Sequence, residues 1–145
     1  MKYELDGHHK GMPVWPQERN MREARRTLRK LLDDRRSFVL VAETKEGEAI
    51  GMLTYRIVRR ETRHSGYRMV ADVGMMFVGE RYRRLGVGRA LVARCIEHLE
   101  RRGVQHVTLR SVVANAQGNR FWDSLGLKPL LYIRSAPVAR VKGKL

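Results

Sequence analysis

Apolar and polar positions repeat along the chain with two different periods. Residues 17–32 carry apolar side chains every three to four positions, which predicts an amphipathic helix. Residues 38–43 and 49–58 are runs of strand-forming residues around a polar turn with Gly47, so they predict an antiparallel hairpin. A third strand is predicted over residues 67–78, and its length favours a bulge or bend.

The second half of the chain predicts helices that alternate with strands. An apolar stripe over residues 88–99 predicts a helix, and Gly103 is suited to a left-handed cap after it. The strand expected next, over 104–113, should run parallel to the third strand because a helix crosses between them. A short helix over 116–125 and a last strand over 130–133 complete the pattern.

The junction between the third strand and the following helix has a pattern suited to an anion. Residues 78–91 read Val-Gly-Glu-Arg-Tyr-Arg-Arg-Leu-Gly-Val-Gly-Arg-Ala-Leu. The first amides of a helix have no intrahelical acceptor, and Gly86 and Gly88 keep side chains away from an approaching diphosphate. A glycine pair also serves a turn that binds nothing, so both interpretations remain open. Positive charge is added by Arg83, Arg84 and Arg89.

Composition narrows the class of protein. The 145 residues, 43% of them hydrophobic, suit one domain with a core. The net charge of +15 implies an anionic ligand or partner, but its spread along the chain argues against nucleic acid. No apolar run is long enough for a membrane span and no secretory signal is present, so we expect a cytoplasmic protein. Cys95 is expected to pack in the core, and His8 and His9 lack further ligands at metal-binding spacing.

Two motifs resemble those of the GNAT family of acetyl-coenzyme A-dependent N-acetyltransferases. Residues 83–88, Arg-Arg-Leu-Gly-Val-Gly, are similar to the family's Gln/Arg-x-x-Gly-x-Gly/Ala coenzyme-binding motif. Residues 115–127, Asn-Ala-Gln-Gly-Asn-Arg-Phe-Trp-Asp-Ser-Leu-Gly-Leu, are similar to its Asn-x-x-Ala-x-x-Phe-Tyr-x-x-x-Gly-Phe motif. The motifs stand in the family's order and separation, and the resemblance covers residues 17–134.

The resemblance implies an α/β (α+β) fold with a mixed, mostly antiparallel sheet, a central splayed pair of parallel strands and flanking helices. It implies an irregular lead-in over residues 1–16, one acetyltransferase domain over 17–135 and a basic tail over 136–145. The family's usual N-terminal strand and helix are shortened here. Since that end frames the acceptor pocket in the family, the pocket is expected to be more open or completed by a second copy in a homodimer.

The resemblance also implies acetyl-coenzyme A as co-substrate and no metal. The glycine turn would hold the pyrophosphate, and the pantetheine arm would pair with the third strand like an additional strand. Asn115 would reach this arm, and Trp122 would pack beside it. The implied coenzyme-binding residues are Met76, Phe77, Val78, Arg83, Arg84, Leu85, Gly86, Val87, Gly88, Arg89, Asn115 and Trp122.

Catalytic roles follow from the same resemblance. The backbone amide of Met76 would stabilise the oxyanion of the tetrahedral intermediate. Asp72 stands where histone-acetylating relatives carry a glutamate base, although an acid in a half-buried strand is also commonly paired with an arginine. The weaker candidates for the base are Glu43 and Glu80.

The chain departs from the family at the residue that protonates the leaving thiolate. The family usually has a tyrosine at the position of Trp122, and an indole N–H is far too weak an acid to replace it. Tyr132, Tyr82 or solvent would then supply the proton. The acid is therefore the least defined catalytic group.

The expected reaction is transfer of acetyl to a primary amine on a small molecule, a peptide or a protein. The basic surface favours an acidic acceptor. Two rival hypotheses belong to other classes. The first is a sensor or scaffold that binds a coenzyme A ester without catalysis, as the missing tyrosine suggests, and the second is a basic nucleic-acid-binding module.

Overall fold

The computed structural model describes residues 17–59, 68–130 and 142–143. The chain divides into two compact units, residues 1–110 and 111–145, which we describe separately. The lead-in over residues 1–16 lies outside the described residues, as do nearly all of the predicted strand over 130–133 and most of the basic tail.

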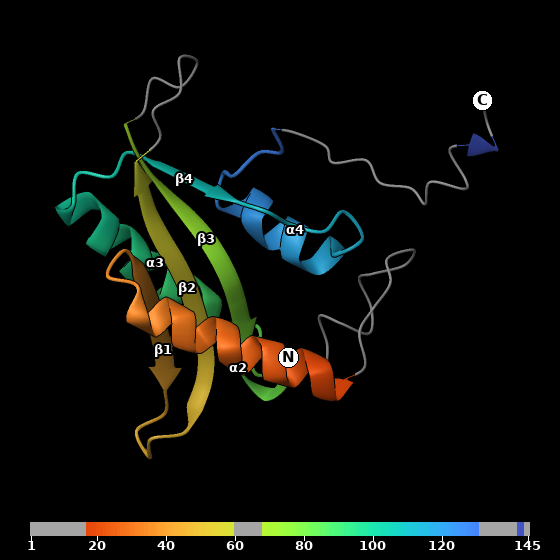
Figure 1. Cartoon of the computed structure of the whole chain (residues 1–145). Coiled ribbons are helices and arrows are strands. Elements are labelled where there is room, and N and C mark those ends of the chain that lie inside the picture. Colours follow the sequence, from red (N-terminus) through yellow and green to blue (C-terminus); the bar gives the residue numbers. More distant parts are fainter. Residues whose placement is uncertain (1–16, 60–67, 131–141, 144–145) are drawn as a thin grey trace. The chain divides into compact units, whose positions relative to one another are not determined.

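The first unit is built on a mixed sheet with the strand order β1-β2-β3-β4 (Figure 1). The strands are β1 (Ser37–Glu43), β2 (Ala49–Arg59), β3 (Met69–Val78) and β4 (His106–Leu109). The first three pair antiparallel, and β3 pairs parallel with β4. The predicted α/β class with a mostly antiparallel sheet and one parallel pair is confirmed. Among the described strands, this parallel pair lies at one edge of the sheet.

Strand β4 is much shorter than the strand predicted over residues 104–113. The backbone groups at the two ends of that prediction are used in a helix cap and in a turn. The N–H of Val104 donates to the carbonyl of Leu99 at 3.0 Å, and the carbonyl of Val112 accepts from the N–H of Asn115 at 2.9 Å. These backbone groups are paired outside the sheet, and the strand prediction was wrong at both ends.

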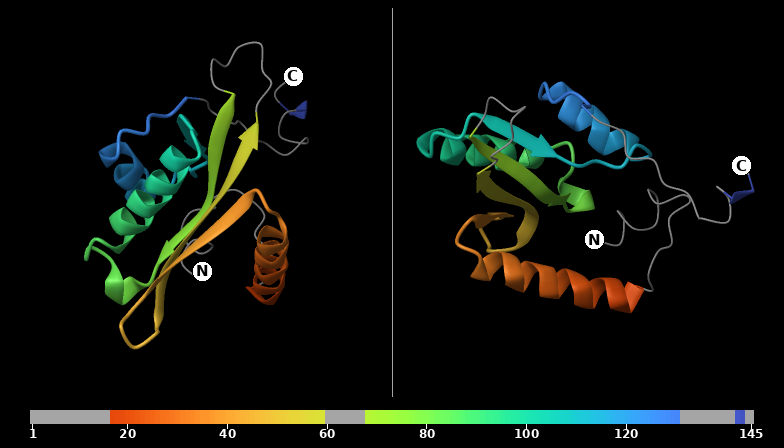
Figure 2. Two further views of the ribbon diagram at one scale, coloured as in Figure 1. Left: turned by 90° about the vertical axis from the view of Figure 1, so that its left-hand side faces the viewer. Right: turned by 45° about the horizontal axis from the view of Figure 1, so that its top comes forward.

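Two helices of the first unit lie on opposite faces of this sheet (Figures 1 and 2). Helix α2 (Gln17–Asp33) contacts mainly β1, whereas α3 (Val87–Arg101) packs across β1, β2 and β3. Both match the predicted helical segments to within a residue or two at most ends.

The core lies between α3 and the sheet. Helix α3 buries an i, i+4, i+8 stripe, as an amphipathic helix on a sheet should. Burial raises the pKa of the Cys95 thiol to about 11, so this side chain packs as an uncharged group and the core prediction for it is confirmed. The buried side chains on the two sides are Leu91, Cys95 and Leu99 of α3 and Leu53, Tyr55, Ile57, Ala71 and Val73 of the sheet.

Helix α3 ends in the left-handed cap expected at Gly103, which has a φ of 67°. The Gly103 N–H donates to the Glu100 carbonyl at 2.9 Å, and the Val104 N–H donates to the Leu99 carbonyl at 3.0 Å. These two bonds form a Schellman motif, which satisfies carbonyls that the helix itself cannot pair.

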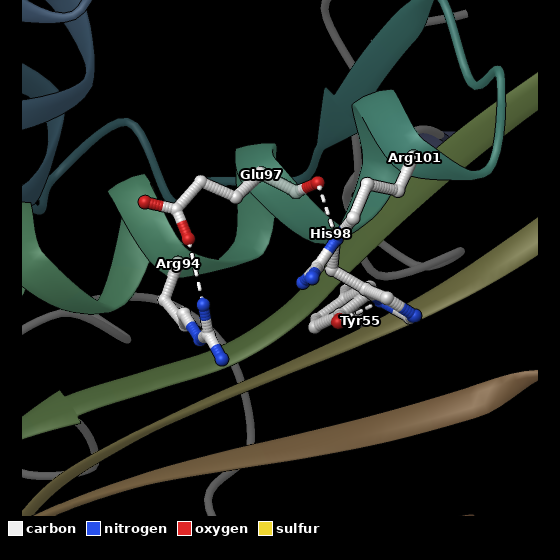
Figure 3. A network of polar contacts seen from close by, with 5 residues as sticks. All are labelled: Tyr55, Arg94, Glu97, His98 and Arg101. Carbon is white, nitrogen blue, oxygen red and sulfur yellow. Dashed lines mark hydrogen bonds and ion pairs between the residues drawn. The ribbon is translucent and has the colours of Figure 1, made fainter.

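One polar contact crosses the α3 interface (Figure 3). The Tyr55 hydroxyl and Nδ1 of His98 share a hydrogen bond of 2.5 Å, and the Phe38 ring packs against both rings. Burial raises the pKa of Tyr55 to about 12, so its hydroxyl remains protonated. Burial, followed by the charges of nearby arginines such as Arg102, lowers the pKa of His98 below 6.5.

We expect His98 to make folding stability depend on pH. Because its folded pKa is lowered, the unfolded chain binds the proton first, and stability rises with pH in that window. The contribution is complete above about pH 6.5 and is lost as the pH falls through the folded pKa. When the free energy of unfolding is measured by denaturant titration at several pH values between 5 and 8, it should change less with pH for His98→Gln than for the native chain. An equal pH dependence of the free energy of unfolding in both proteins would contradict this prediction.

Candidate functional site

The turn between β3 and α3 is tightly curled backbone. A 3-10 turn, η1 (Glu80–Tyr82), follows β3, and positive φ values then occur at Arg84 (65°) and Gly86 (84°). Such curls bring successive amides to one concave side, where they can bind an anion. Gly86 is the N-cap of α3 and has no side-chain cap bond. The first intrahelical bond runs from the Ala90 N–H to the Gly86 carbonyl at 3.0 Å, so earlier helical amides precede the ladder.

Glycine at position 86 meets two needs at once. Its φ of 84° is a backbone conformation that L-amino acids other than glycine rarely adopt. A Cβ built there would meet no heavy atom within 4 Å. The space beside this turn is therefore open, which the predicted pyrophosphate site requires. Four arginines against one glutamate make the segment positive, and these residues are Arg81, Arg83, Arg84, Arg89 and Glu80.

Strand β3 contains the irregularity that its length predicted. The register places Leu53 opposite Met76 but Tyr55 opposite Val73, so two residues of β3 face Thr54 alone. This is a β-bulge, and Thr54 holds it because its hydroxyl oxygen accepts the Met75 N–H at 2.8 Å. Thr54 is only 2% exposed, so its hydroxyl satisfies a buried amide.

We expect Thr54→Val to lower the free energy of unfolding by about 1–3 kcal/mol, because it leaves the Met75 N–H unpaired in a buried site. Denaturant titration measures this change. Thr44→Val is the matched control, since the Thr44 hydroxyl accepts the Glu48 N–H at 3.2 Å in an exposed turn. Thr54→Ser should retain most of the stability. Equal losses for Thr54→Val and Thr44→Val would show that the bulge does not depend on this bond.

No described strand pairs with the outer edge of β3 after the bulge. Pairing with β4 ends at Val73, opposite Leu109, the last residue of β4. The amides of Met75 and Gly79 both point toward β2, where they donate to Thr54 and to the Ile50 carbonyl. The backbone N–H and C=O groups of successive strand residues point alternately to the two neighbouring edges. Those of Phe77 therefore also point toward β2, and those of Met76 and Val78 point away from it. The residues that face the outer edge are Met76 and Val78.

Arg83 connects this edge to the glycine turn. Its Nε donates to the Val78 carbonyl at 3.1 Å, and Val78 is one of the two residues whose backbone faces outward. A guanidinium is thereby fixed where the exposed strand edge meets the glycine turn. The neighbourhood combines an extended backbone edge, a cation and helix-start amides.

Tyr82 ties the turn to the β1–β2 hairpin and is poorly suited to be the missing acid. Its hydroxyl donates to Oε2 of Glu48 at 2.7 Å, and this bond is the main cause that raises its pKa above 10.0. The other candidate acid, Tyr132, lies outside the described residues. The weaker base candidates Glu43 and Glu80 are exposed, at the end of β1 and in η1.

Asp72 lies on β3 before the bulge, four residues from Met76 along the strand, and is half-buried. Its Oδ1 accepts a hydrogen bond from the Thr108 hydroxyl of β4. Arg56 lies directly opposite it on β2. The carboxylate therefore has a fixed donor on one side and a cation on the neighbouring strand.

The second unit contains α4 (Ala116–Ser124), with Asn115 as its N-cap. The Oδ1 of Asn115 accepts the Gly118 N–H at 2.9 Å and so caps the first turn of the helix. A Cβ on Gly118, where the family motif has alanine, would lie 2.6 Å from Nδ2 of Asn115. Trp122 packs edge-to-face on Phe121, with ring centroids 5.0 Å apart. Both Asn115 and Trp122 thus have structural roles within their own unit.

A comparison with protein-family models supplies the decisive relationship. The model described as the acetyltransferase (GNAT) family matches residues 6–127, most of the chain. The chain belongs to the GNAT family. A search of curated proteins finds no match to this GNAT chain.

Solved structures share the fold of this GNAT domain. A putative acetyl transferase from Pyrococcus furiosus is 21% identical over 88% of this chain and 82% of its own, with a TM-score of 0.72. An aminoglycoside 6'-N-acetyltransferase from Acinetobacter haemolyticus is 18% identical over 80% and 81%, with a TM-score of 0.66. The aminoglycoside N-acetyltransferase AAC(6')-Iy, solved in complex with CoA, is 18% identical over 82% and 90%, with a TM-score of 0.64.

Three side chains of this site were not identified from the sequence. Thr54 holds the bulge, Thr108 donates to Asp72, and Arg56 faces that carboxylate. Each gains its role through strand pairing. Within the part of the chain that the structure describes, no group of three or more His, Cys, Asp or Glu could hold a metal ion. No helix of that part is both long and apolar enough to cross a membrane.

Proposed function

We propose that the protein is an N-acetyltransferase that moves acetyl from acetyl-coenzyme A to a primary amine. One observation carries the proposal. In a GNAT chain, a strand edge at Met76 and Val78 that no described strand pairs with runs directly into a positively charged turn with open space beside Gly86. This continuous surface suits a ligand whose long amide-bearing arm is attached to a diphosphate.

The binding roles follow from backbone direction. The outward backbone groups of Met76 and Val78 would pair with the amides of the pantetheine arm, as in strand addition. The amides of Val87 and Gly88 would donate to the pyrophosphate at the positive end of α3, and the nearby arginines would add charge. Phe77, whose backbone faces β2, would contribute its side chain and not its amide.

The chemical step requires a neutral amine and a stabilised oxyanion. Asp72 would take one proton from the acceptor ammonium, directly or through a water. The amine nitrogen then attacks the thioester carbonyl carbon, and the Met76 amide would donate to the developing oxyanion. As the C–S bond breaks, the nitrogen releases its remaining excess proton to solvent, and the leaving thiolate takes a proton from solvent, because Tyr82 is bonded to Glu48 and Trp122 is no acid. The products are an N-acetyl amine and coenzyme A.

A second candidate function rests on Trp122. Without the family's tyrosine, the protein would bind a coenzyme A ester as a sensor or scaffold and transfer nothing. The two candidates share the binding site and differ only in chemistry.

Labelled acetyl-coenzyme A and a panel of amines and peptides separate these candidates. Acetylated amine together with an equal amount of free thiol is the expected result. Tight coenzyme binding without transfer to any acceptor would support the sensor. Salt-dependent binding to duplex or single-stranded nucleic acid that coenzyme A fails to displace would instead support a nucleic-acid-binding module.

A further inference from the structure

A row of polar side chains crosses the sheet of the first unit on the face opposite α3. In the strand register, Ser37 of β1 lies opposite Arg56 of β2, Arg56 opposite Asp72 of β3, and Asp72 opposite Thr108 of β4. Directly paired residues on neighbouring strands point to the same face. Tyr55, the neighbour of Arg56, points to the other face, where its hydroxyl reaches α3.

Asp34, in the loop between α2 and β1, fixes one end of this row. Its Oδ1 accepts the Arg36 N–H at 3.1 Å, and its Oδ2 accepts the Ser37 hydroxyl at 2.8 Å and pairs with Nε of Arg56 at 3.0 Å. The Arg36 N–H and the Ser37 hydroxyl, followed by the charge of Arg56, lower the pKa of Asp34 below 3.8. Asp34 is therefore an ionised clamp on Arg56.

Arg56 retains recognition capacity beyond this clamp. Nε is one of five guanidinium donors, and the terminal nitrogens have no partner among the described residues. The side chain is 52% exposed, so an anion can approach it. Two planar N–H groups of a guanidinium match the two oxygens of a carboxylate.

Asp72 presents the opposite charge on the next strand. The Thr108 hydroxyl occupies part of the acceptor capacity of Oδ1 and orients the carboxylate. Paired residues on adjacent strands have backbones about 5 Å apart, so one small ligand that carries both charges could bridge the side chains of Asp72 and Arg56. Across the sheet, the row therefore presents a cation at Arg56, which Asp34 of the preceding loop holds, then an anion at Asp72 and a hydroxyl at Thr108.

We propose that this row selects acceptor amines that carry a carboxylate a few bonds from the nitrogen, as amino acids do. The acceptor ammonium would lie on Asp72 and the acceptor carboxylate on Arg56. The inference rests on the proposed function, because it deepens the acceptor side of the same transfer. The proton balance is that of the proposed reaction, with Arg56 neither gaining nor losing a proton.

Electrostatics favour such a zwitterion over a simple cation. A diamine would place its second ammonium against Arg56, and like charges at this separation repel. Arg35 and Arg36 are also exposed in the loop that carries Asp34, so the surroundings attract anions. An amine without a carboxylate would leave Arg56 with no ligand partner.

The test compares acceptors that differ only at the carboxylate. Glycine, β-alanine, 4-aminobutyrate and leucine are each assayed beside the corresponding carboxamide, with thiol release from acetyl-coenzyme A as the readout. At least one acid should exceed its carboxamide in kcat/KM by about tenfold or more, the scale of a charge-assisted pair. Equal values for every pair would overturn the inference.

Variants of Arg56 assign the preference to this residue. Arg56→Gln should bring the acid-to-carboxamide ratio close to one, and Arg56→Glu should invert it and admit 1,3-diaminopropane. Loss of folding alone cannot produce an inverted preference. Arg94→Gln is the matched control, because Arg94 pairs with Glu97 at 2.8 Å on exposed α3 and should leave the ratio unchanged (Figure 3).

The outcomes separate this inference from the proposed function. If carboxamides and acids both react but equally well, only the acceptor inference fails. A ratio that Arg56→Gln leaves unchanged also overturns it. If no amine in the panel releases thiol while calorimetry still shows acetyl-coenzyme A binding, the transfer function and the acceptor inference fail together.

Discussion

Gly86→Glu is expected to abolish coenzyme A binding, with a rise in Kd of at least about 100-fold from charge repulsion at a desolvated phosphate site. The backbone at Gly86 has a φ of 84°, and nothing lies within 4 Å of a Cβ built there. A glutamate would therefore extend into the open space that the pyrophosphate needs, with a like charge. The left-handed backbone conformation costs a residue with a side chain only about 1–2 kcal/mol, so charge repulsion should dominate the loss of coenzyme A binding. Isothermal titration with acetyl-coenzyme A measures the change.

Gly103→Glu is the matched control for this substitution. Gly103 also has a positive φ, 67°, with no heavy atom within 4 Å of a Cβ, but it lies at the other end of α3. It should show a similar backbone cost and bind coenzyme A as the native chain does. If Gly86→Glu binds acetyl-coenzyme A normally, the turn is not the pyrophosphate site.

Asp72→Asn is expected to reduce kcat by about 100-fold at neutral pH, within the range of general base catalysis, while the affinity for acetyl-coenzyme A stays unchanged. The amide is nearly isosteric and can still interact with the Thr108 hydroxyl, so the sheet should remain intact. The deficit should shrink as the pH rises, because the acceptor ammonium then loses its proton without help. A pH profile of kcat for both proteins measures this.

Asp33→Asn controls for the loss of one carboxylate, since Asp33 is exposed at the end of α2. Thr108→Val should give an intermediate loss in kcat, because Asp72 keeps its charge but loses the donor that orients it. A rate for Asp72→Asn that equals the native rate at every pH would remove Asp72 from the mechanism.

Most of the fold follows from local patterns in the sequence. The stripe of Leu91, Cys95 and Leu99 recurs at helical spacing, and Gly103 adopts the left-handed cap it was expected to form. The length of β3 indicated a bulge, and the bulge lies opposite Thr54. These features depend on neighbours within a few positions along the chain, which is why a single sequence reveals them.

The polar row could not be predicted in the same way. Its members lie on four different strands, and their alignment depends on the register of each pairing. A register slip of one residue would turn Asp72 to the opposite face, away from Arg56. The end of β4 was also beyond local reasoning, because Val112 is a typical strand residue but its carbonyl accepts the Asn115 N–H in the turn before α4.

The missing acid is a difference of another kind. The sequence showed directly that Trp122 cannot replace a tyrosine, and the structure adds that Tyr82 donates to Glu48. Thiolate protonation by solvent is consistent with both observations. It predicts that no single tyrosine substitution among the described residues eliminates turnover.

The most direct test of the account maps coenzyme A onto the backbone by NMR. In titrations with coenzyme A, the largest amide shifts should fall on the turn at Gly86, Val87 and Gly88 and on the strand edge at Met76 and Val78. Pantetheine, which lacks the diphosphate, should shift only the strand edge. Shifts gathered instead on the exposed arginines of α2, with the turn and the edge unmoved, would contradict the account.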